Sequence, residues 1–358
     1  MTPSFRSGIA IAGLSALVAA GCSGADTVDS GLAAEVSDRP TIVATTNILG
    51  DVISNLVGDQ FDVVTIMPVG ADPHVFQASA QQVASMGDAD VLIANGAGFE
   101  EGLLDVIESS EADGVPVLEA ISVVAGLEFG EGEEHGHEDE EHEGEEHEGE
   151  EHEGEEHEGE EHEGEEHEGE EHEGEEGHAH DGLDPHFFTD PARMATVATA
   201  VSDFLIETVD GVDAAALTAS SEAYVDELVA LDREVSETLG AIDDVDRVLI
   251  TNHEVFGYFA DRYDFEVVGT VIPSGTTTDG VSAQDLEELA EVIEHEGVQA
   301  IFAETSSSDE LIQTLSSEVG DVAVVDLYSE SLGDVDSAGA TYIDMVRTNA
   351  ERIAGALG

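Results

Sequence analysis

Past residue 40, short runs of apolar and β-branched residues alternate with longer segments whose apolar residues recur every three or four positions. This alternation is typical of βαβ units, in which helices cover a mostly parallel sheet. It occurs as two series, separated by one long helical pattern. We therefore predict an α/β fold of two similar lobes, each built from parallel-sheet α/β units and joined by one long linking helix.

The same periodicities give the expected ranges. In the first series, strands are predicted at 41–45, 63–67, 91–94 and 115–118, and helices at 48–57, 79–86, 99–109 and 191–209. In the second, strands are predicted at 248–251, 266–270, 300–303 and 322–326, and helices at 283–295, 308–319 and 342–357. The long helix is expected at 214–239, which at about 1.5 Å per residue is enough to cross a small domain. The resulting divisions are an N-terminal lobe at 40–130 that is completed at 182–212, a linking helix at 213–240 and a C-terminal lobe at 241–358.

The charge balance excludes several classes of partner. The 358 residues include 84 acidic and eight basic side chains, all eight of them arginine, for a formal charge of −76. A nucleic-acid-binding protein needs clustered Lys and Arg to displace counterions, so we expect no nucleic-acid partner. An anionic membrane surface would also repel the chain. The single cysteine, Cys22, excludes a disulfide scaffold and a cysteine-based zinc finger.

Residues 1–21 have the features of a signal peptide. Arg6 precedes an uncharged, mostly apolar stretch at 8–21 that is too short to span a bilayer as a stable helix. The stretch ends in Ala19-Ala-Gly-Cys22, which resembles a bacterial lipoprotein cleavage box with Cys22 as the lipidated residue. Two or more acyl chains would anchor the protein to the outer face of the cytoplasmic membrane, with 22–39 as a polar tether. The alternative is an ordinary secretory signal with an incidental cysteine.

Residues 131–181 form a low-complexity tract that interrupts the first lobe. It contains 29 of the acidic residues and 11 of the 15 histidines. High charge density, few apolar residues and a glycine in every repeat predict disorder. Imidazoles flanked by carboxylates can bind zinc, copper or nickel weakly, so the tract is either a low-affinity metal-binding segment or a solvated acidic spacer. Seven copies of Glu-His-Glu-Gly-Glu place histidines five residues apart, at His142, His147, His152, His157, His162, His167 and His172.

The four histidines outside this tract are His74, His186, His253 and His295. Three of them lie where a predicted strand or loop meets the next element, the usual position of ligand residues in open α/β sheets. His74 follows the second predicted strand, His186 precedes the fourth predicted helix, and His253 follows the first strand of the second series. His295 lies between two glutamates on a predicted helix and is expected to be exposed to solvent.

Four segments of the sequence together resemble a known family, although no one of them is specific alone. They are Gly70-Ala-Asp-Pro-His74, Ala89-Asp-Val-Leu-Ile-Ala-Asn-Gly-Ala-Gly-Phe-Glu100, the His-rich insertion followed by Asp184-Pro-His186, and His253-Glu-Val-Phe-Gly-Tyr-Phe-Ala260. The chain resembles the metal-specific solute-binding proteins of bacterial ABC transporters, in particular the zinc-uptake type, over about residues 40–358. The resemblance implies two lobes hinged on one long helix, with a metal site in the cleft between them.

The resemblance also implies a ligand set. One ligand is expected from each of the three histidine motifs, and a fourth, a carboxylate, from the end of a late strand. Asp326, in Val324-Val-Asp326-Leu-Tyr328, matches that last position. Three imidazoles and one carboxylate would complete a four-coordinate zinc shell. Glu304, at the end of another predicted strand, is assigned an outer or structural place beside the site.

Nitrogen-rich ligation favours zinc over manganese. We therefore predict a monomeric binding protein, not an enzyme, that captures zinc outside the cell and delivers it to the membrane permease of an ABC transporter. Manganese or iron import by the same architecture is one alternative. An extracellular zinc metalloenzyme is the other, but it would need an open coordination position and a general base, and the chain has no His-Glu-x-x-His motif.

Overall fold

The computed structural model describes residues 39–129 and 182–358, with the exception of 279, 307, 309 and 321. The predicted signal peptide, Cys22 and the tether up to residue 38 lie outside the described residues. So does the tract at 131–181 with its seven evenly spaced histidines. The roles assigned to these segments therefore stay predictions.

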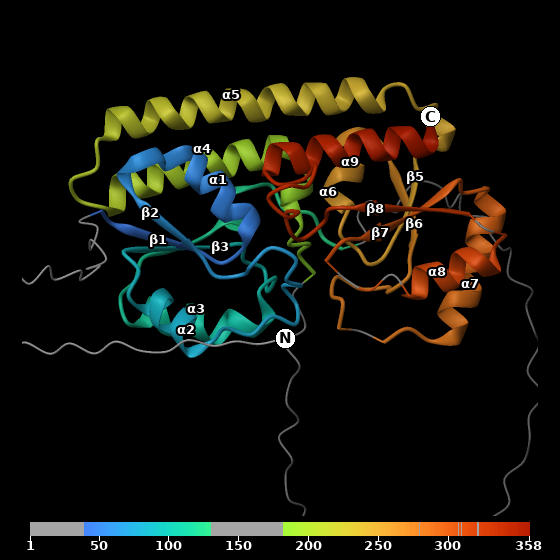
Figure 1. Ribbon diagram of the computed structural model, residues 1–358, viewed down its shortest axis with the longest axis horizontal. Coiled ribbons are helices and arrows are strands. Elements are labelled where there is room, and N and C mark those ends of the chain that lie inside the picture. Colours follow the sequence, from blue (N-terminus) through green and yellow to red (C-terminus); the bar gives the residue numbers. More distant parts are fainter. Residues whose placement is uncertain (1–38, 130–181, 279, 307, 309, 321) are drawn as a thin grey trace, which may run out of the picture. The chain divides into compact units, whose positions relative to one another are not determined.

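The first sheet contains four parallel strands in the order β2-β1-β3-β4 (Figure 1). The strands are β1 (Thr41–Ala44), β2 (Asp62–Thr65), β3 (Val91–Ala94) and β4 (Val117–Glu119). Two helices, α1 (Asn47–Val57) and α4 (Pro191–Thr208), pack on one face, and α2 (Ala80–Gly87) and α3 (Leu104–Ala112) pack on the other. The N-terminal lobe is thus a sheet between two layers of helix.

The second sheet repeats this plan with the strand order β6-β5-β7-β8. Its strands, again all parallel, are β5 (Val248–Thr251), β6 (Glu266–Thr270), β7 (Ala300–Glu304) and β8 (Ala323–Leu327). The helices α6 (Gly257–Tyr263) and α9 (Tyr342–Leu357) lie on one face, and α7 (Ala283–Glu296) and α8 (Glu310–Glu318) on the other. The equivalent strand orders confirm the prediction of two similar parallel-sheet lobes.

The long helix α5 (Ala214–Leu239) connects the two sheets in sequence and lies over both of them (Figure 1). It packs on α1 and α4 of the first lobe and on α9 of the second. Its buried face follows the predicted helical spacing, with Tyr224, Leu228, Leu231 and Val235 among the buried residues. The linking helix is therefore confirmed.

The core on the α5 side is continuous between the lobes. A single cluster of buried apolar side chains includes Ile42 and Val91 of the first sheet, Leu249 and Phe302 of the second, and the inner faces of α4, α5 and α9. Burying one large aliphatic side chain contributes about 1.5–3 kcal/mol. Separating the lobes along this side would expose many such side chains, so we expect the lobes to keep their relative position there.

The helix α6 is absent from the sequence prediction. It is only seven residues long, and Tyr258, Phe259, Ala260 and Tyr263 are all buried. Its two exposed polar residues, Asp261 and Arg262, are adjacent, and a helix this short shows no repeated polar stripe to mark a helical period. Among the helices of the described residues, none combines the length and the apolar character needed to cross a membrane.

Candidate metal centre

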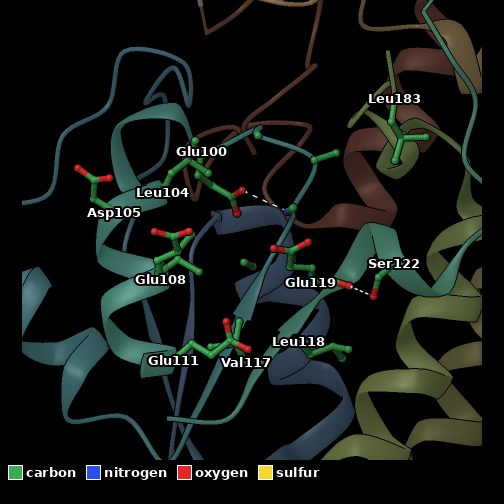
Figure 2. A pocket seen from close by; sticks show the side chains of 15 residues that line it. Glu100, Leu104, Asp105, Glu108, Glu111, Val117, Leu118, Glu119, Ser122 and Leu183 are labelled. Carbon is green, nitrogen blue, oxygen red and sulfur yellow. Dashed lines mark hydrogen bonds between the residues drawn. The ribbon is translucent and has the colours of Figure 1, made fainter. Parts of the chain in front are cut away.

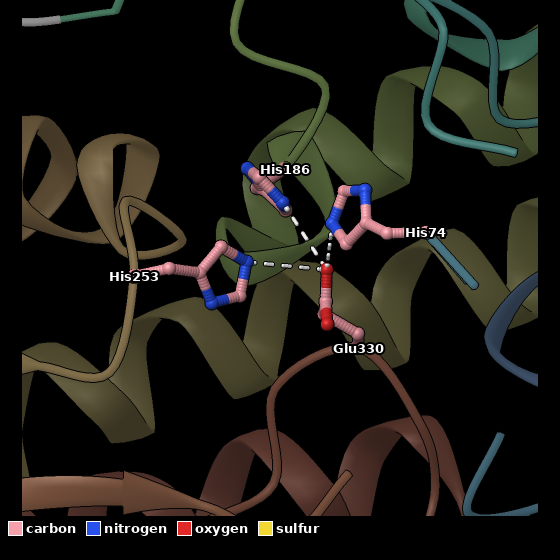
Figure 3. Close-up of side chains that lie close together, drawn as sticks. All are labelled: His74, His186, His253 and Glu330. Carbon is pink, nitrogen blue, oxygen red and sulfur yellow. Dashed lines mark hydrogen bonds and ion pairs between the residues drawn. The ribbon is translucent and has the colours of Figure 1, made fainter. Parts of the chain in front are cut away.

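Four buried side chains converge on one point (Figure 3). His74, His186, His253 and Glu330 each offer one ligand atom, and these atoms all lie within 4.8 Å of one another. The Nε2 atoms of the three histidines, in that order, lie 2.8, 3.4 and 3.3 Å from Oε1 of Glu330. The structure therefore brings together the three histidines that the sequence singled out. The fourth, His295, is exposed on α7 and lies beside Glu296.

Both lobes contribute to this centre from beyond the carboxyl ends of their strands. His74 lies in the loop after β2, and His186 lies just before a short 3-10 helix that leads into α4. His253 lies two residues past β5, and Glu330 lies three residues past β8. Ligands of open parallel sheets gather at this edge because the strand ends and the loops that follow them meet there.

The fourth side chain corrects the expectation for Asp326. Asp326 lies inside β8, opposite Ala303 of β7, and its side chain is exposed. Residues within a strand point alternately to the two faces of the sheet, so Asp326 does not reach the point beyond the strand end. The sequence prediction ended this strand at 326 and took its last residue as the ligand. The offset of His253 from its own strand would have directed attention to 329–331, where Glu330 lies.

Each histidine ring also contacts a second carboxylate, on the nitrogen that faces away from Glu330. The three Nδ1 atoms lie 3.1, 2.7 and 2.7 Å from carboxylate oxygens, in the pairs His74 with Glu101, His186 with Asp184 and His253 with Glu304. Such a partner fixes the tautomer and orientation of the ring and leaves Nε2 as the donor atom for a metal. Glu304 thus lies on the far side of His253 from Glu330.

The repeated Asp-Pro-His sequence positions two of the histidines through the main chain. Oδ1 of Asp72 accepts a hydrogen bond from the N–H of His74 at 2.9 Å, and Oδ1 of Asp184 accepts one from the N–H of His186 at the same distance. An aspartate that accepts from the residue two positions later forms a local turn without help from the rest of the fold. The backbone at both histidines is therefore set locally.

The loop that carries Glu330 is pinned to the opposite lobe. The side chain of Asn47, at the start of α1, donates to Ser331 Oγ at 3.1 Å and accepts from the N–H of Leu332 at 2.7 Å. Ser331 Oγ also accepts from the N–H of Gly70 at 2.7 Å. Glu330 belongs to the second lobe by sequence, but its position is fixed by contacts with both lobes.

The loop between β3 and α3 forms one wall of the centre. The ring of Phe99 lies edge-on against His74 and His186, with centroid separations of 5.6 and 5.5 Å. The next residue, Glu100, is fully buried and accepts hydrogen bonds from the hydroxyl of Thr45 and from two backbone N–H groups of the loop. Burial raises the pKa of Glu100. This loop replaces the first turns of the helix that the sequence predicted from residue 99.

Burial and charge act in opposite directions on the titrating groups of the centre. Burial alone would lower the pKa of His74, but hydrogen bonds to Glu101 and Glu330 outweigh it and raise the pKa to about 9. Burial also opposes charge on His253, and the charges of Glu304 and Glu330 raise its pKa well above the ordinary value. Burial would raise the pKa of Glu330, but His253 and the other two imidazoles lower it well below the ordinary value. Protons on His74 and His253 therefore compete with a metal for this point.

Three buried atoms of the centre have no hydrogen-bond partner among the described residues. They are Nε2 of His186, Nε2 of His253 and Oε2 of Glu330. Leaving such an atom unsatisfied costs about 1–3 kcal/mol. A divalent cation at the point where the four side chains meet would be coordinated by the two imidazole nitrogens and the carboxylate. The donor set therefore suits a metal ion.

Two cavities border the loop that contains Phe99. The smaller, of about 210 Å³, opens onto His74 and is lined by Ala97–Phe99, Phe129, Pro185 and Ser274–Thr276. The larger, of about 760 Å³, lies between α3 and β4 (Figure 2) and has Asp105, Glu108, Glu111 and Glu119 among its lining residues. None of the four converging side chains lines the larger cavity. Of these two cavities, only the smaller is lined by a residue of the centre, and it is called the mouth below.

Two similar parallel-sheet lobes, a long helix over both and a buried ligand cluster at the carboxyl ends of the strands define a bilobed substrate-binding protein. Residues 42–356 match the family model described as zinc-uptake complex component A, periplasmic, and the chain therefore belongs to this family. The family consists of metal-binding substrate-binding proteins of ABC transporters, not of enzymes. This confirms the resemblance inferred from the sequence motifs.

The relatives carry the names of two different metals. The manganese-binding lipoprotein MntA of Halalkalibacterium halodurans is 25% identical over 96% of this chain and 95% of its own length. The zinc-binding protein TroA of Treponema pallidum is 26% identical over 90% of this chain and 91% of its own. A solved structure of the periplasmic zinc-binding protein TroA from Treponema pallidum superimposes with a TM-score of 0.70, at 25% identity, over 89% of this chain and 99% of that one. A crystal structure of ZnuA has the same fold, with a TM-score of 0.67 at 20% identity over 90% of this chain and all of that one.

Proposed function

We propose that this protein captures zinc outside the cell and delivers it to the membrane permease of an ABC transporter. The observation that carries the proposal is the convergence of three imidazole Nε2 atoms on the carboxylate of Glu330 in a buried position. Two donors of a tetrahedral zinc site, each about 2.0–2.1 Å from the ion, lie roughly 3.3 Å apart. The separations of 3.3 and 3.4 Å for two of the histidines agree with this value. Four protein donors leave no position for an activated water, which favours binding over hydrolysis.

Manganese is the second candidate, and one atom of the centre favours it. Oε2 of Glu330 is buried and has no hydrogen-bond partner among the described residues, so this carboxylate could supply a fifth donor to a larger ion. The name of the relative MntA points the same way. Against manganese, imidazole nitrogen suits zinc better, and manganese prefers sites richer in oxygen.

A calorimetric titration distinguishes these candidates. In a soluble variant that starts after Cys22 and lacks 131–181, we expect one tight zinc site, much weaker manganese binding, and loss of the tight site in His253→Ala. His295→Ala is the matched control, because this histidine is exposed and lies outside the centre. Tighter binding of manganese than of zinc, or no tight site for either metal, would contradict the proposal.

We further propose that the tract at 131–181 supplies weak accessory sites and that Cys22 carries the lipid anchor. The two residues that flank the undescribed segment lie together, since the N–H of Phe129 donates to the carbonyl of Gly182 at 2.8 Å. Phe129 also lines the cavity that opens onto His74. The described residues on either side of the tract therefore lie beside the mouth. Lipidation is supported by the lipoprotein names of several relatives.

Substitution of Glu304, whose carboxylate lies against the outer nitrogen of His253, tests whether Glu304 supports a metal ligand or is itself a ligand. We expect Glu304→Gln to weaken zinc binding by about 10- to 100-fold, the usual cost of losing an outer partner of a metal ligand. Competition against a chelator of known affinity measures the change. Glu296→Gln on the surface of α7 is the control and should bind zinc normally. Complete loss of the site in Glu304→Gln would instead make Glu304 a direct ligand.

A further inference from the structure

Residues 273–278, here called the strap, follow β6 and leave the second lobe at the mouth of the centre. The base of the strap is tied to the segment that carries His253. The N–H of Ile272 donates to the carbonyl of Asn252 at 2.8 Å, and the N–H of Glu254 donates to the carbonyl of Ser274 at 3.1 Å. Any movement at the base of the strap therefore acts next to His253.

The other end of the strap is bonded to the first lobe through two threonine hydroxyls. Thr276 Oγ1 donates to Oε1 of Glu101 at 2.8 Å, and Thr277 Oγ1 donates to Oδ2 of Asp72 at 2.7 Å. These two carboxylates are the ones that hold His74. Glu101 lies on the Nδ1 atom of its ring, and Asp72 accepts from its main-chain N–H.

The strap also forms part of the mouth itself. Ser274, Gly275 and Thr276 line the cavity that opens onto His74, across from Phe129. Gly275 lies directly against the Phe129 ring, because a Cβ atom at this position would be 2.1 Å from a ring carbon. Any larger residue there would require the Phe129 ring to move.

Opening the strap disrupts far less structure than separating the lobes. The lobes share one continuous apolar core on the α5 side. Among the described residues, two hydroxyl hydrogen bonds and the contact with Phe129 attach the strap to the first lobe. The cost of moving an element scales with the apolar surface and hydrogen bonds it gives up. An ion that reaches His74 through this cavity has to pass the strap.

We propose that the strap is the gate of the metal centre, and that Thr276 and Thr277 are positioning residues that set the rate of metal exchange by holding Asp72 and Glu101. The inference rests on the proposed function and adds a control point to the same site. Neither threonine is a candidate ligand. Loss of their hydroxyls therefore speeds the passage of metal in both directions and changes the equilibrium affinity little.

The test compares the full chain with its Thr276→Val/Thr277→Val variant, each loaded with one equivalent of zinc. Stopped-flow transfer of zinc to a chromophoric chelator gives the release rate, and rapid mixing of zinc with protein and chelator gives the association rate. We expect both rates to rise about tenfold or more, as loss of two hydrogen bonds to carboxylates implies. The dissociation constant should change less than about threefold. In the full chain, His253→Ala should remove the tight site, so the zinc that this variant still binds measures what the tract holds.

Two matched control variants show whether faster zinc exchange is caused by loss of the two threonine hydroxyls or by a general disturbance of the structure. Thr276→Ser/Thr277→Ser keeps both hydroxyls and should exchange zinc at the original rates. Thr314→Val on the surface of α8 should also do so, because Thr314 is exposed, lies outside the strap and donates its hydroxyl to the carbonyl of Glu310 in its own helix. Unchanged rates in the double valine variant, or faster release without faster association, would overturn the gate. Lack of a tight zinc site in the unsubstituted chain would overturn the proposed function, and the gate with it.

Discussion

Substitution of Glu330 by glutamine should abolish tight zinc binding, whereas Asp326→Asn should leave it unchanged. Glu330 is fully buried, and its Oε1 atom lies within 3.4 Å of all three imidazole Nε2 atoms. The amide keeps the size of the side chain but removes the negative charge that attracts the cation. We expect zinc affinity to fall by more than about 100-fold, because loss of a direct ligand should cost more than the roughly 10- to 100-fold loss caused by removal of an outer partner.

The aspartate is the matched control because it is an acidic residue of the same segment with an exposed side chain. Calorimetric zinc titration of both variants gives the affinities, and thermal unfolding without metal shows whether each variant is folded. If Asp326→Asn lost the site while Glu330→Gln kept it, the assignment of the fourth ligand would be reversed.

The second large effect is a steep loss of zinc affinity on acidification. The pKa of His74 is raised to about 9 and that of His253 is raised well above its ordinary value, so both hold protons at neutral pH when no metal is bound. Zinc must displace these protons to reach Nε2. With two protons displaced, affinity falls by up to about 100-fold per pH unit over the range in which both histidines hold their protons.

Calorimetry in buffers with different ionisation enthalpies counts the released protons, and we expect about two per zinc ion at pH 7. Equal affinity at pH 8 and pH 6 would rule out displacement of protons from these imidazoles.

The stability of the metal-free protein should change with pH in the opposite direction to its zinc affinity. A histidine whose pKa is raised by folding stabilises the metal-free protein below about pH 6.5, and this contribution disappears as the pH rises through about 9. Zinc should therefore raise the unfolding temperature more at pH 9 than at pH 6.

The regular elements of this fold could be predicted from local patterns. The strands at 91–94, 248–251 and 266–270 and the helices at 214–239 and 342–357 have the predicted bounds. The strands are short runs rich in apolar and β-branched residues, and the helices have apolar residues at three- and four-residue spacing. The exceptions are short or irregular. The helix α6 is only seven residues long and mostly buried, and the loop that carries Phe99 is held by a buried glutamate instead of continuing the predicted helix.

Part of the centre was also visible in the sequence. His74 and His186 occur in repeated Asp-Pro-His motifs whose turns form locally, and His253 follows a strand with a clear end. Glu330 has no comparable signal. It lies in a chain with 84 acidic residues, in a loop whose position depends on hydrogen bonds with Asn47, which is 283 residues earlier.

The sequence by itself determined the two-lobe α/β plan, the long linking helix and three of the four converging side chains, because periodicity and turn chemistry act over a few residues. Only the tertiary structure decided that Glu330, and not Asp326, completes the cluster and that Glu101, Asp184 and Glu304 face the outer nitrogens of the three rings. It also decided that Thr276 and Thr277 reach across to the carboxylates that hold His74. Such contacts depend on how two lobes meet, and no local pattern records the distance between residues that are far apart in the chain.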